Sequence, residues 1–294
     1  MFKSCTSSQL GKNRHLNRIF NYEKCVIVPM DDSLISGSEQ GLFDLDAKIT
    51  EICSARPNAI LGYVGSLSLL SRKSYDIPII LNLTASTERS THTNKRLITN
   101  IERALVLGAD AVAVHINVSS IYESHMLEII GKVSDACDRY GLPMMVIAYP
   151  RGESFLGEHK VMDNNYIKLQ SASNEEYTKL VCHCVRIAFE LGADIIKTKY
   201  TGSKESFESV VQYAQGIPLL VAGGEMMQYQ ELFSMCRNAI DAGATGVCIG
   251  RNVFNRQASQ NIVTVLNEIV IDGISVEKVI DRINILERKI INEK

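Results

Sequence analysis

Eight short apolar runs recur along the chain, and a longer segment of helical character follows each of them. Apolar runs without polar alternation are typical of parallel strands that are covered on both faces. The runs span residues 24–30, 58–64, 77–83, 110–116, 143–149, 194–200, 217–223 and 245–250. Eight strands alternating with helices favour a closed (β/α)8 TIM barrel over an open sheet. An open doubly wound sheet would also favour a G-x-G-x-x-G turn after its first strand, which this sequence lacks.

The sequence therefore predicts a single α/β barrel domain over residues 21–294. Residues 1–20 form an N-terminal extension that we expect to cap the barrel floor. Segments 94–109 and 124–141 are predicted helices, because apolar residues recur on one face. Glycine-containing turns end three of the predicted helices directly before a strand, at residues 107–110, 191–194 and 241–244.

One predicted connection is long for a compact domain. Residues 153–173, after the fifth strand, show no clear periodicity. Loops of that length are usually lids or binding loops, or else they are disordered. Because this loop follows a strand end, it would lie on the catalytic face of a barrel, and we expect a lid that closes over substrate. The alternative is that its apolar side chains pack against a neighbouring subunit.

Charge and cysteine content narrow the classes of partner and compartment. A formal net charge of −2 gives no reason to expect nucleic acid or an anionic membrane surface. No apolar segment reaches the roughly 18 residues that a membrane span needs, and the N-terminus lacks the apolar stretch of a secretory signal. The eight cysteines form no regular framework, which predicts free thiols in a reducing cytoplasm. Cys182-His183-Cys184 lies in a helical pattern without a second pair at zinc-like spacing, so no metal site is predicted.

Chemistry-bearing residues gather at the carboxyl ends of the predicted strands, which converge on one mouth of a barrel. They are Asp31, Asp32, Asn82, Thr84, His115, Asn117, Tyr149, Lys197, Lys199, Gly223, Gly224, Gly250 and Arg251. The loops after the last two strands of a barrel often build a phosphate site from backbone N–H groups. Glycine lets the backbone approach an anion closely, and Arg251 adds a fixed positive charge. The alternative is that these glycines only turn strand into helix.

Lys197 lies inside the apolar run 194–200, although lysine is rarely buried without a partner. In a barrel interior, desolvation would lower the pKa of this amine and expose a nucleophile that forms a Schiff base with a ketone. Asp31 and Tyr149 are candidates for the proton transfers that such chemistry needs. The alternative is that the strand ends early and that Lys197 and Lys199 both extend into water.

Five stretches of the sequence resemble the class I aldolases of the archaeal fructose-bisphosphate aldolase type, a group within the deoxyribose-phosphate aldolase superfamily. They are VIVPMD (26–31), YPRG (149–152), GADIIKTKYTG (192–202), VAGG (221–224) and GVCIGRNVF (246–254). Within that group, the stretches VPMD, GLFDLDAKI and VHINV are most similar to the 2-amino-3,7-dideoxy-D-threo-hept-6-ulosonate synthases.

The resemblance implies a metal-independent aldolase or transaldolase that uses no cofactor. It implies that Lys197 forms the Schiff base and that Asp31 and Tyr149 are the other catalytic residues. The phosphate-binding residues would be Gly223, Gly224, Gly250 and Arg251. Further candidates for substrate binding are Asp32, His115, Asn117, Lys199 and Arg151.

The expected reaction transfers a C3 unit from a phosphorylated ketose or dihydroxyacetone phosphate to aspartate semialdehyde or a similar aldehyde, in a homo-oligomer. Cleavage of fructose 1,6-bisphosphate is the first alternative. A catalytically silent barrel that binds sugar phosphate is the second. The second is favoured only by Asp32-Ser33, which stand where the family usually has His-Gly. The loop after YPRG is also longer than the family's usual connection.

Overall fold

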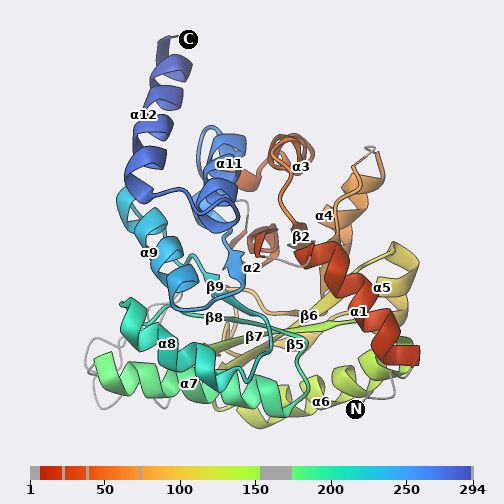
Figure 1. Cartoon of the computed structure of the whole chain (residues 1–294). Coiled ribbons are helices and arrows are strands. Elements are labelled where there is room, and N and C mark those ends of the chain that lie inside the picture. Colours follow the sequence, from red (N-terminus) through yellow and green to blue (C-terminus); the bar gives the residue numbers. More distant parts are fainter. Residues whose placement is uncertain (1–6, 22–23, 38–39, 73–74, 153–173, 293–294) are drawn as a thin grey trace.

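The computed structural model describes residues 7–21, 24–37, 40–72, 75–152 and 174–292. Eight parallel strands close into a barrel in the order β1-β10-β9-β8-β7-β6-β3-β2 (Figure 1). The strands are β1 (Cys25–Pro29), β2 (Ala59–Gly62), β3 (Ile79–Asn82), β6 (Ala111–Val118), β7 (Met144–Pro150), β8 (Ile195–Thr198), β9 (Leu219–Ala222) and β10 (Gly246–Cys248). Every strand overlaps one of the eight apolar runs, so the predicted TIM barrel is confirmed.

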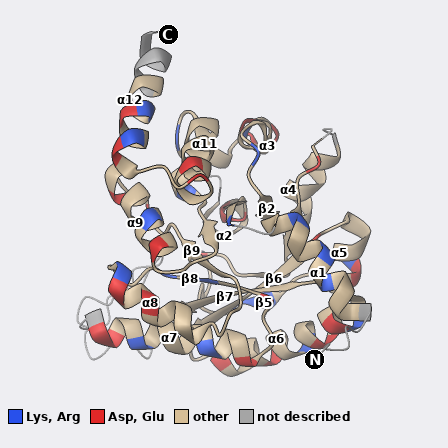
Figure 2. Ribbon diagram, viewed as in Figure 1, with Lys and Arg blue, Asp and Glu red and all other residues tan. Residues whose placement is uncertain are grey.

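Helices surround the barrel, and an apolar layer lies between them and the strands. They are α1 (Ser7–Phe20), α2 (Asp32–Ser36), α3 (Leu45–Ser54), α4 (Val64–Ser68), α5 (Ile101–Leu107), α6 (Glu123–Tyr140), α7 (Asn174–Glu190), α8 (Lys204–Tyr213), α9 (Tyr229–Asp241), α10 (Arg251–Phe254), α11 (Ser259–Val270) and α12 (Val276–Asn292), with short 3-10 turns at Gln40–Leu42 and Leu69–Arg72. Along α6 the buried residues Met126, Ile129, Ile130 and Val133 face the barrel, as their helical spacing predicts. Figure 2 shows acidic and basic residues mixed along α7, α8 and α12.

A two-stranded antiparallel hairpin interrupts the segment between β3 and α5. It pairs β4 (Thr84–Ala85) with β5 (Arg96–Leu97). The prediction of a continuous helix over 94–109 is therefore wrong at its N-terminal end. The helix begins at Ile101, because the Asn100 side chain accepts a hydrogen bond from the Arg103 N–H and caps it. The hairpin carries its connecting residues, 86–95, over the mouth of the barrel.

Helix α1 closes the opposite end of the barrel. Ile19 and Phe20 pack into the interior apolar cluster. Lys12 forms ion pairs with Asp138 at 2.5 Å and with Asp194 at 2.9 Å. Asp194 immediately precedes β8, which places α1 at the amino ends of the strands. The floor is thus sealed by apolar contact inside and by ion pairs at its rim.

Inward-pointing side chains form the interior of the barrel, since side-chain direction alternates along each strand. Ile27, Ile147, Ile195 and Leu220 belong to the interior apolar cluster. Polar residues replace this apolar layer toward the carboxyl ends of the strands. Within the described ranges, no helix is long and apolar enough to cross a membrane. The predicted lid, residues 153–173, lies outside the described residues.

Candidate active site

A cavity opens at the carboxyl ends of the barrel strands. Its wall includes Asp31, Asp32, Glu88, His92, Lys95, His115, Tyr149, Arg151, Lys197, Lys199, Gly223, Gly224, Cys248, Gly250 and Arg251. Of the residues predicted to meet at the mouth, Asn82, Thr84 and Asn117 do not line this cavity and the others do. Asn117 is fully buried behind it, where its Nδ2 donates to the Thr93 carbonyl at 3.0 Å.

Lys197 points into the barrel from the middle of β8. Ile195 belongs to the interior cluster, so the alternation of the strand directs Lys197 to the same side. The strand continues past Lys197 to Thr198, and only 7% of the lysine is exposed. The alternative of an early strand end with the lysine in water is therefore wrong for Lys197.

The pKa of Lys197 is raised above its ordinary value, which corrects the expectation that burial would lower it. Burial does oppose the ammonium, but Cys248, Tyr149 and Asp31 together favour the charged form more strongly, and the Cys248 thiol also hydrogen-bonds the amine. A neutral, nucleophilic Lys197 therefore requires transfer of its proton to a nearby acceptor.

Asp31 follows β1 and is held by its neighbours. Its Oδ2 accepts a hydrogen bond of 2.9 Å from Asn82 Nδ2. Asn82 is itself fixed, because its Oδ1 accepts from the Thr84 N–H at 3.1 Å. Tyr63 donates to the Thr84 carbonyl at 3.1 Å, and burial, with Asp31 and Asp32, raises its pKa. Asp31 is thus a fixed carboxylate 9% exposed at the cavity wall.

The ring of Tyr149 lies among cationic and aromatic side chains. His115 meets it edge-on with 5.0 Å between ring centroids. Lys199 Nζ lies 5.0 Å and Arg151 Cζ 5.4 Å from the centre of the Tyr149 ring. Burial, followed by Arg151, Arg251 and Lys197, lowers the pKa of Lys199 well below its usual range. The two lysines therefore differ: Lys197 favours the ammonium and Lys199 the neutral amine.

The loops after β9 and β10 bring their glycines to the cavity as predicted. Gly224 adopts a φ of +68°, and a Cβ on Gly223 would lie 2.9 Å from Ile249 Cδ1. Asn252 joins the loops, since its Oδ1 accepts from the Met227 N–H at 2.8 Å and its Nδ2 donates to the Glu225 carbonyl at 2.6 Å.

Arg251 and Asp32 form an ion pair at the rim, with Arg251 Nε 3.5 Å from Asp32 Oδ2. Asp32, which stands where the family usually has histidine, therefore restrains Arg251. This contact explains how an acidic residue is accommodated beside a predicted phosphate site.

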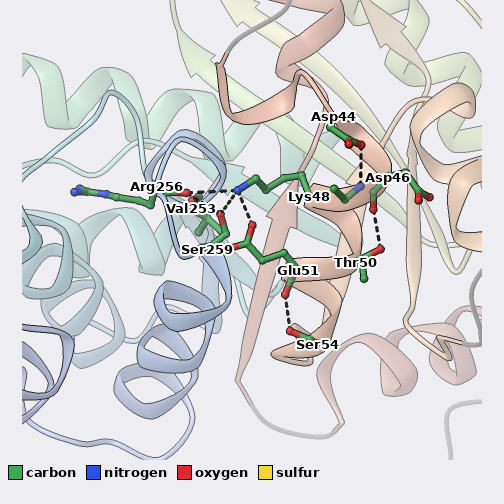
Figure 3. A network of polar contacts seen from close by, with 10 residues as sticks. Asp44, Asp46, Lys48, Thr50, Glu51, Ser54, Val253, Arg256 and Ser259 are labelled. Atoms are coloured by element: carbon green, nitrogen blue, oxygen red, sulfur yellow. Dashed lines mark hydrogen bonds and ion pairs between the residues drawn. The ribbon is translucent and has the colours of Figure 1, made fainter. Parts of the chain in front are cut away.

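A polar network supports the segment that follows Arg251 (Figure 3). Lys48 of α3 contacts Glu51 Oε2 at 2.6 Å and Ser259 Oγ at 2.9 Å. The Ser259 N–H, at the start of α11, donates to Glu51 Oε1 at 2.5 Å. These bonds tie α11 to α3 and hold the preceding loop against the barrel.

Cys248, His92, Lys95 and Glu88 line the cavity but were not predicted as site residues. Cys248 could have been found, because it alternates with Gly246 and Gly250 along the last strand and shares their inward direction. The other three lie between β4 and β5, in a polar stretch whose sequence resembles an exposed loop. Lys95 is nevertheless only 1% exposed. Among the described residues, no group of three or more His, Cys, Asp or Glu side chains is arranged to hold a metal ion.

Comparison with known proteins extends these observations. The sequence pattern of the DeoC/LacD family of aldolases matches residues 25–256. The 2-amino-3,7-dideoxy-D-threo-hept-6-ulosonate synthase 1 of Archaeoglobus fulgidus is 35% identical, over 92% of this chain and 95% of the relative. The class 1 fructose-bisphosphate aldolase of Thermoproteus tenax is 32% identical, over 69% of this chain and 73% of the relative.

A solved structure of a Schiff-base-forming fructose-1,6-bisphosphate aldolase has a TM-score of 0.74 and 26% identity, covering 88% of this chain and 99% of the other. The family match, the relatives and this structure agree with the barrel. The chain belongs to the DeoC/LacD family of aldolases and is an enzyme of the class I, carbon–carbon bond-forming type.

Proposed function

We propose that Lys197 forms a Schiff base with a phosphorylated ketose or dihydroxyacetone phosphate, and that the enzyme transfers the C3 unit to a short aldehyde. The observation that carries this proposal is the position of Lys197, whose amine lies inside the barrel beside Asp31 and Tyr149. The same cavity is lined by Gly223, Gly224, Gly250 and Arg251, which suit the binding of a phosphate group.

The covalent step follows from ordinary imine chemistry. The neutral Lys197 amine adds to the ketone carbon to give a carbinolamine, which loses the former ketone oxygen as water and leaves a protonated imine. The imine withdraws electrons from the neighbouring carbon, so a carbon–carbon bond to that carbon can break or form. Asp31 and Tyr149 accept and return the protons, while Gly223, Gly224, Gly250 and Arg251 bind the phosphate.

Because the pKa of Lys197 is raised, a neighbouring group must accept its proton. Its ammonium must lose a proton before the amine can attack, and Asp31 is the carboxylate that lies nearby. A proton that passes from Lys197 to this carboxylate stays within the site and is available for release of the water molecule. The buried pair can therefore act as both the base and the acid of imine formation.

We favour aspartate semialdehyde as the acceptor. The relatives named 2-amino-3,7-dideoxy-D-threo-hept-6-ulosonate synthase, from Archaeoglobus fulgidus and Halobacterium salinarum, match 92% of the chain, whereas the fructose-bisphosphate aldolase of Thermoproteus tenax matches 69%. Cleavage of fructose 1,6-bisphosphate is the second candidate, favoured by the structural likeness to an aldolase of that name.

Borohydride trapping tests the proposal. Reduction in the presence of dihydroxyacetone phosphate or fructose 1,6-bisphosphate should attach the ketose to Lys197 and abolish activity, and peptide mass spectrometry locates the adduct. A Lys197→Met variant should give no adduct. Recovery of the adduct on Lys199, or normal turnover by Lys197→Met, would overturn the assignment. Turnover with each acceptor then separates transfer to aspartate semialdehyde from simple cleavage.

We further propose a cytoplasmic homo-oligomer. The compartment is supported by the cysteines, since Cys25, Cys53, Cys137, Cys182, Cys184, Cys236 and Cys248 are all buried free thiols. The oligomer is a prediction that analytical ultracentrifugation checks directly, and a monomer at micromolar concentration would contradict it.

A further inference from the structure

We infer that His92, Lys95 and Arg151 form a second anion site, which binds the negatively charged end of the acceptor aldehyde. The inference rests on the proposed function, because it assigns the acceptor's place in the same cavity. The chemistry recognised is a carboxylate or phosphate at the far end of a short aldehyde.

The topology places this cluster across the mouth from the glycine loops. In the closed strand order, β3 and β9 are separated by three strands in either direction, so they lie opposite each other. His92 and Lys95 belong to the connection that follows β3 and β4, whereas Gly223 and Gly224 follow β9. A substrate held by its phosphate at the glycine loops therefore extends toward His92 and Lys95.

Hydrogen bonds fix the connection between β4 and β5, which carries His92 and Lys95. Ser86 Oγ donates to the His92 carbonyl at 2.7 Å, and Asn117 Nδ2 donates to the Thr93 carbonyl at 3.0 Å. The Glu88 N–H donates to the Ile35 carbonyl of α2 at 2.9 Å. Asn117 therefore has a positioning role in place of the substrate contact expected from sequence.

His92 offers a buried donor to the cavity. Arg151 Nη1 lies 2.8 Å from His92 Nε2, and a guanidinium only donates, so Nε2 must be the acceptor. Burial, with Lys95 and Arg151, lowers the pKa of His92 to about 2, so the ring is neutral and its proton is on Nδ1. Nδ1 is buried and has no hydrogen-bond partner among the described residues. A buried donor without an acceptor is costly, and an anion would satisfy it.

Lys95 adds a second donor. It is 1% exposed and lines the cavity, where burial and Arg151 oppose its charge more strongly than Asp31, Asp32 and Glu88 favour it. Arg151, 6% exposed, contributes a guanidinium beside the Tyr149 ring. Arg151 and Lys95 disfavour each other's charge, and an anion bound between them and the neutral His92 would offset that repulsion.

The test compares acceptors that differ in charge. Lys95→Met keeps the volume of the side chain and removes the amine; Lys132→Met, which removes an exposed lysine paired with Glu128 on α6, is the matched control. The acceptors are aspartate semialdehyde, D-glyceraldehyde 3-phosphate and neutral D-glyceraldehyde. Borohydride trapping of dihydroxyacetone phosphate reports donor loading separately, and thermal melting verifies that each variant folds.

In Lys95→Met, we expect kcat/KM for an anionic acceptor to fall about 10–100-fold, while the value for neutral D-glyceraldehyde and the trapping of donor stay within about threefold of wild type. Loss confined to the carboxylate or to the phosphate acceptor identifies which anion the site takes. Equal loss for charged and neutral acceptors, or loss of donor trapping, would overturn the site.

A titration distinguishes failure of this inference from failure of the proposed function. If the wild-type enzyme traps no ketose phosphate, the proposed function fails, but the anion site can still be measured with inorganic phosphate by calorimetry. Phosphate should occupy both anion sites in the wild type and only the glycine loops in Lys95→Met, halving the stoichiometry. An unchanged stoichiometry would overturn the second site whether or not the enzyme is an aldolase.

Discussion

Lys197 in β8 and Lys199, one residue past the end of that strand, share a direction but not a charge state. Both Lys197 and Lys199 line the cavity, because alternation along the strand directs them to the same side. Asp31 lies near Lys197 and favours its ammonium, whereas Arg151 and Arg251 disfavour the ammonium of Lys199. The neighbouring charges, and not burial alone, therefore decide which amine carries the proton.

Removing the hydroxyl of Tyr149 tests its proposed role in proton transfer. Tyr149→Phe keeps the ring contacts with His115 and should lower kcat by roughly 10²–10⁴, since general acid–base catalysis contributes about that much. KM should change little. Tyr140→Phe, on the exposed side of α6, is the control. Steady-state kinetics measure both, and a normal kcat for Tyr149→Phe would remove the residue from the mechanism.

The pH dependence of acceptor binding follows from Lys95. Burial and then Arg151 lower its pKa to about 7, against the opposing effect of Asp31, Asp32 and Glu88. The ammonium is present below that pH and lost above it, so KM for an anionic acceptor should rise about tenfold between about pH 6 and pH 8. Lys95→Met should lack this rise. An identical profile in both enzymes would assign it to another group.

At the level of elements, the sequence predicts the barrel strands and several of the helices because their apolar periodicity is strong. Lys197 could be singled out as a candidate because lysine is rarely buried inside a parallel strand without a partner. The β4–β5 hairpin was missed, since two-residue strands carry no periodicity. Lys95 was missed for a related reason: only tertiary packing buries it, and its sequence neighbours are polar. The charge state of Lys197 was likewise set by residues distant in sequence.

The closure of the barrel depends on a glycine in its last strand. A Cβ on Gly246 would lie 2.2 Å from the Cys25 carbonyl oxygen of β1, so Gly246→Ala must separate β10 from β1. We expect it to lower the free energy of unfolding by about 2–4 kcal/mol. Gly131→Ala in α6 meets no atom within 4 Å and should raise it by about 0.5–1 kcal/mol. Urea denaturation measures both, and equal stabilities would contradict the packing.

In the whole molecule, the floor of the barrel contributes to stability and the mouth carries the candidate active site. Helix α1 and its ion pairs close the amino ends of the strands, while the residues of the cavity occupy the carboxyl ends. Changes that stabilise one end need not disturb the other, which is a general property of this fold.

Lys12→Ala tests this separation. Lys12 is 6% exposed and pairs with Asp194, whose carboxylate would be left without its cation. The free energy of unfolding should fall by about 1–3 kcal/mol, which for a chain of this size lowers Tm by several degrees. kcat and KM at 25 °C should not change. Calorimetry and kinetics are both needed, because a fall in kcat at unchanged Tm would show that the floor influences the mouth.

The hairpin between β3 and α5 has a consequence for how such an enzyme diversifies. Lys197, the proposed imine-forming lysine, lies on a barrel strand, whereas His92 and Lys95 lie on an accessory segment that no barrel strand includes. Exchanging residues 86–95 between relatives would then alter the choice of aldehyde and leave the amine chemistry in place. Selectivity for the aldehyde could then be moved between relatives with this one segment. A library of variants confined to those ten positions would be a small set in which to search for enzymes that form new carbon–carbon bonds.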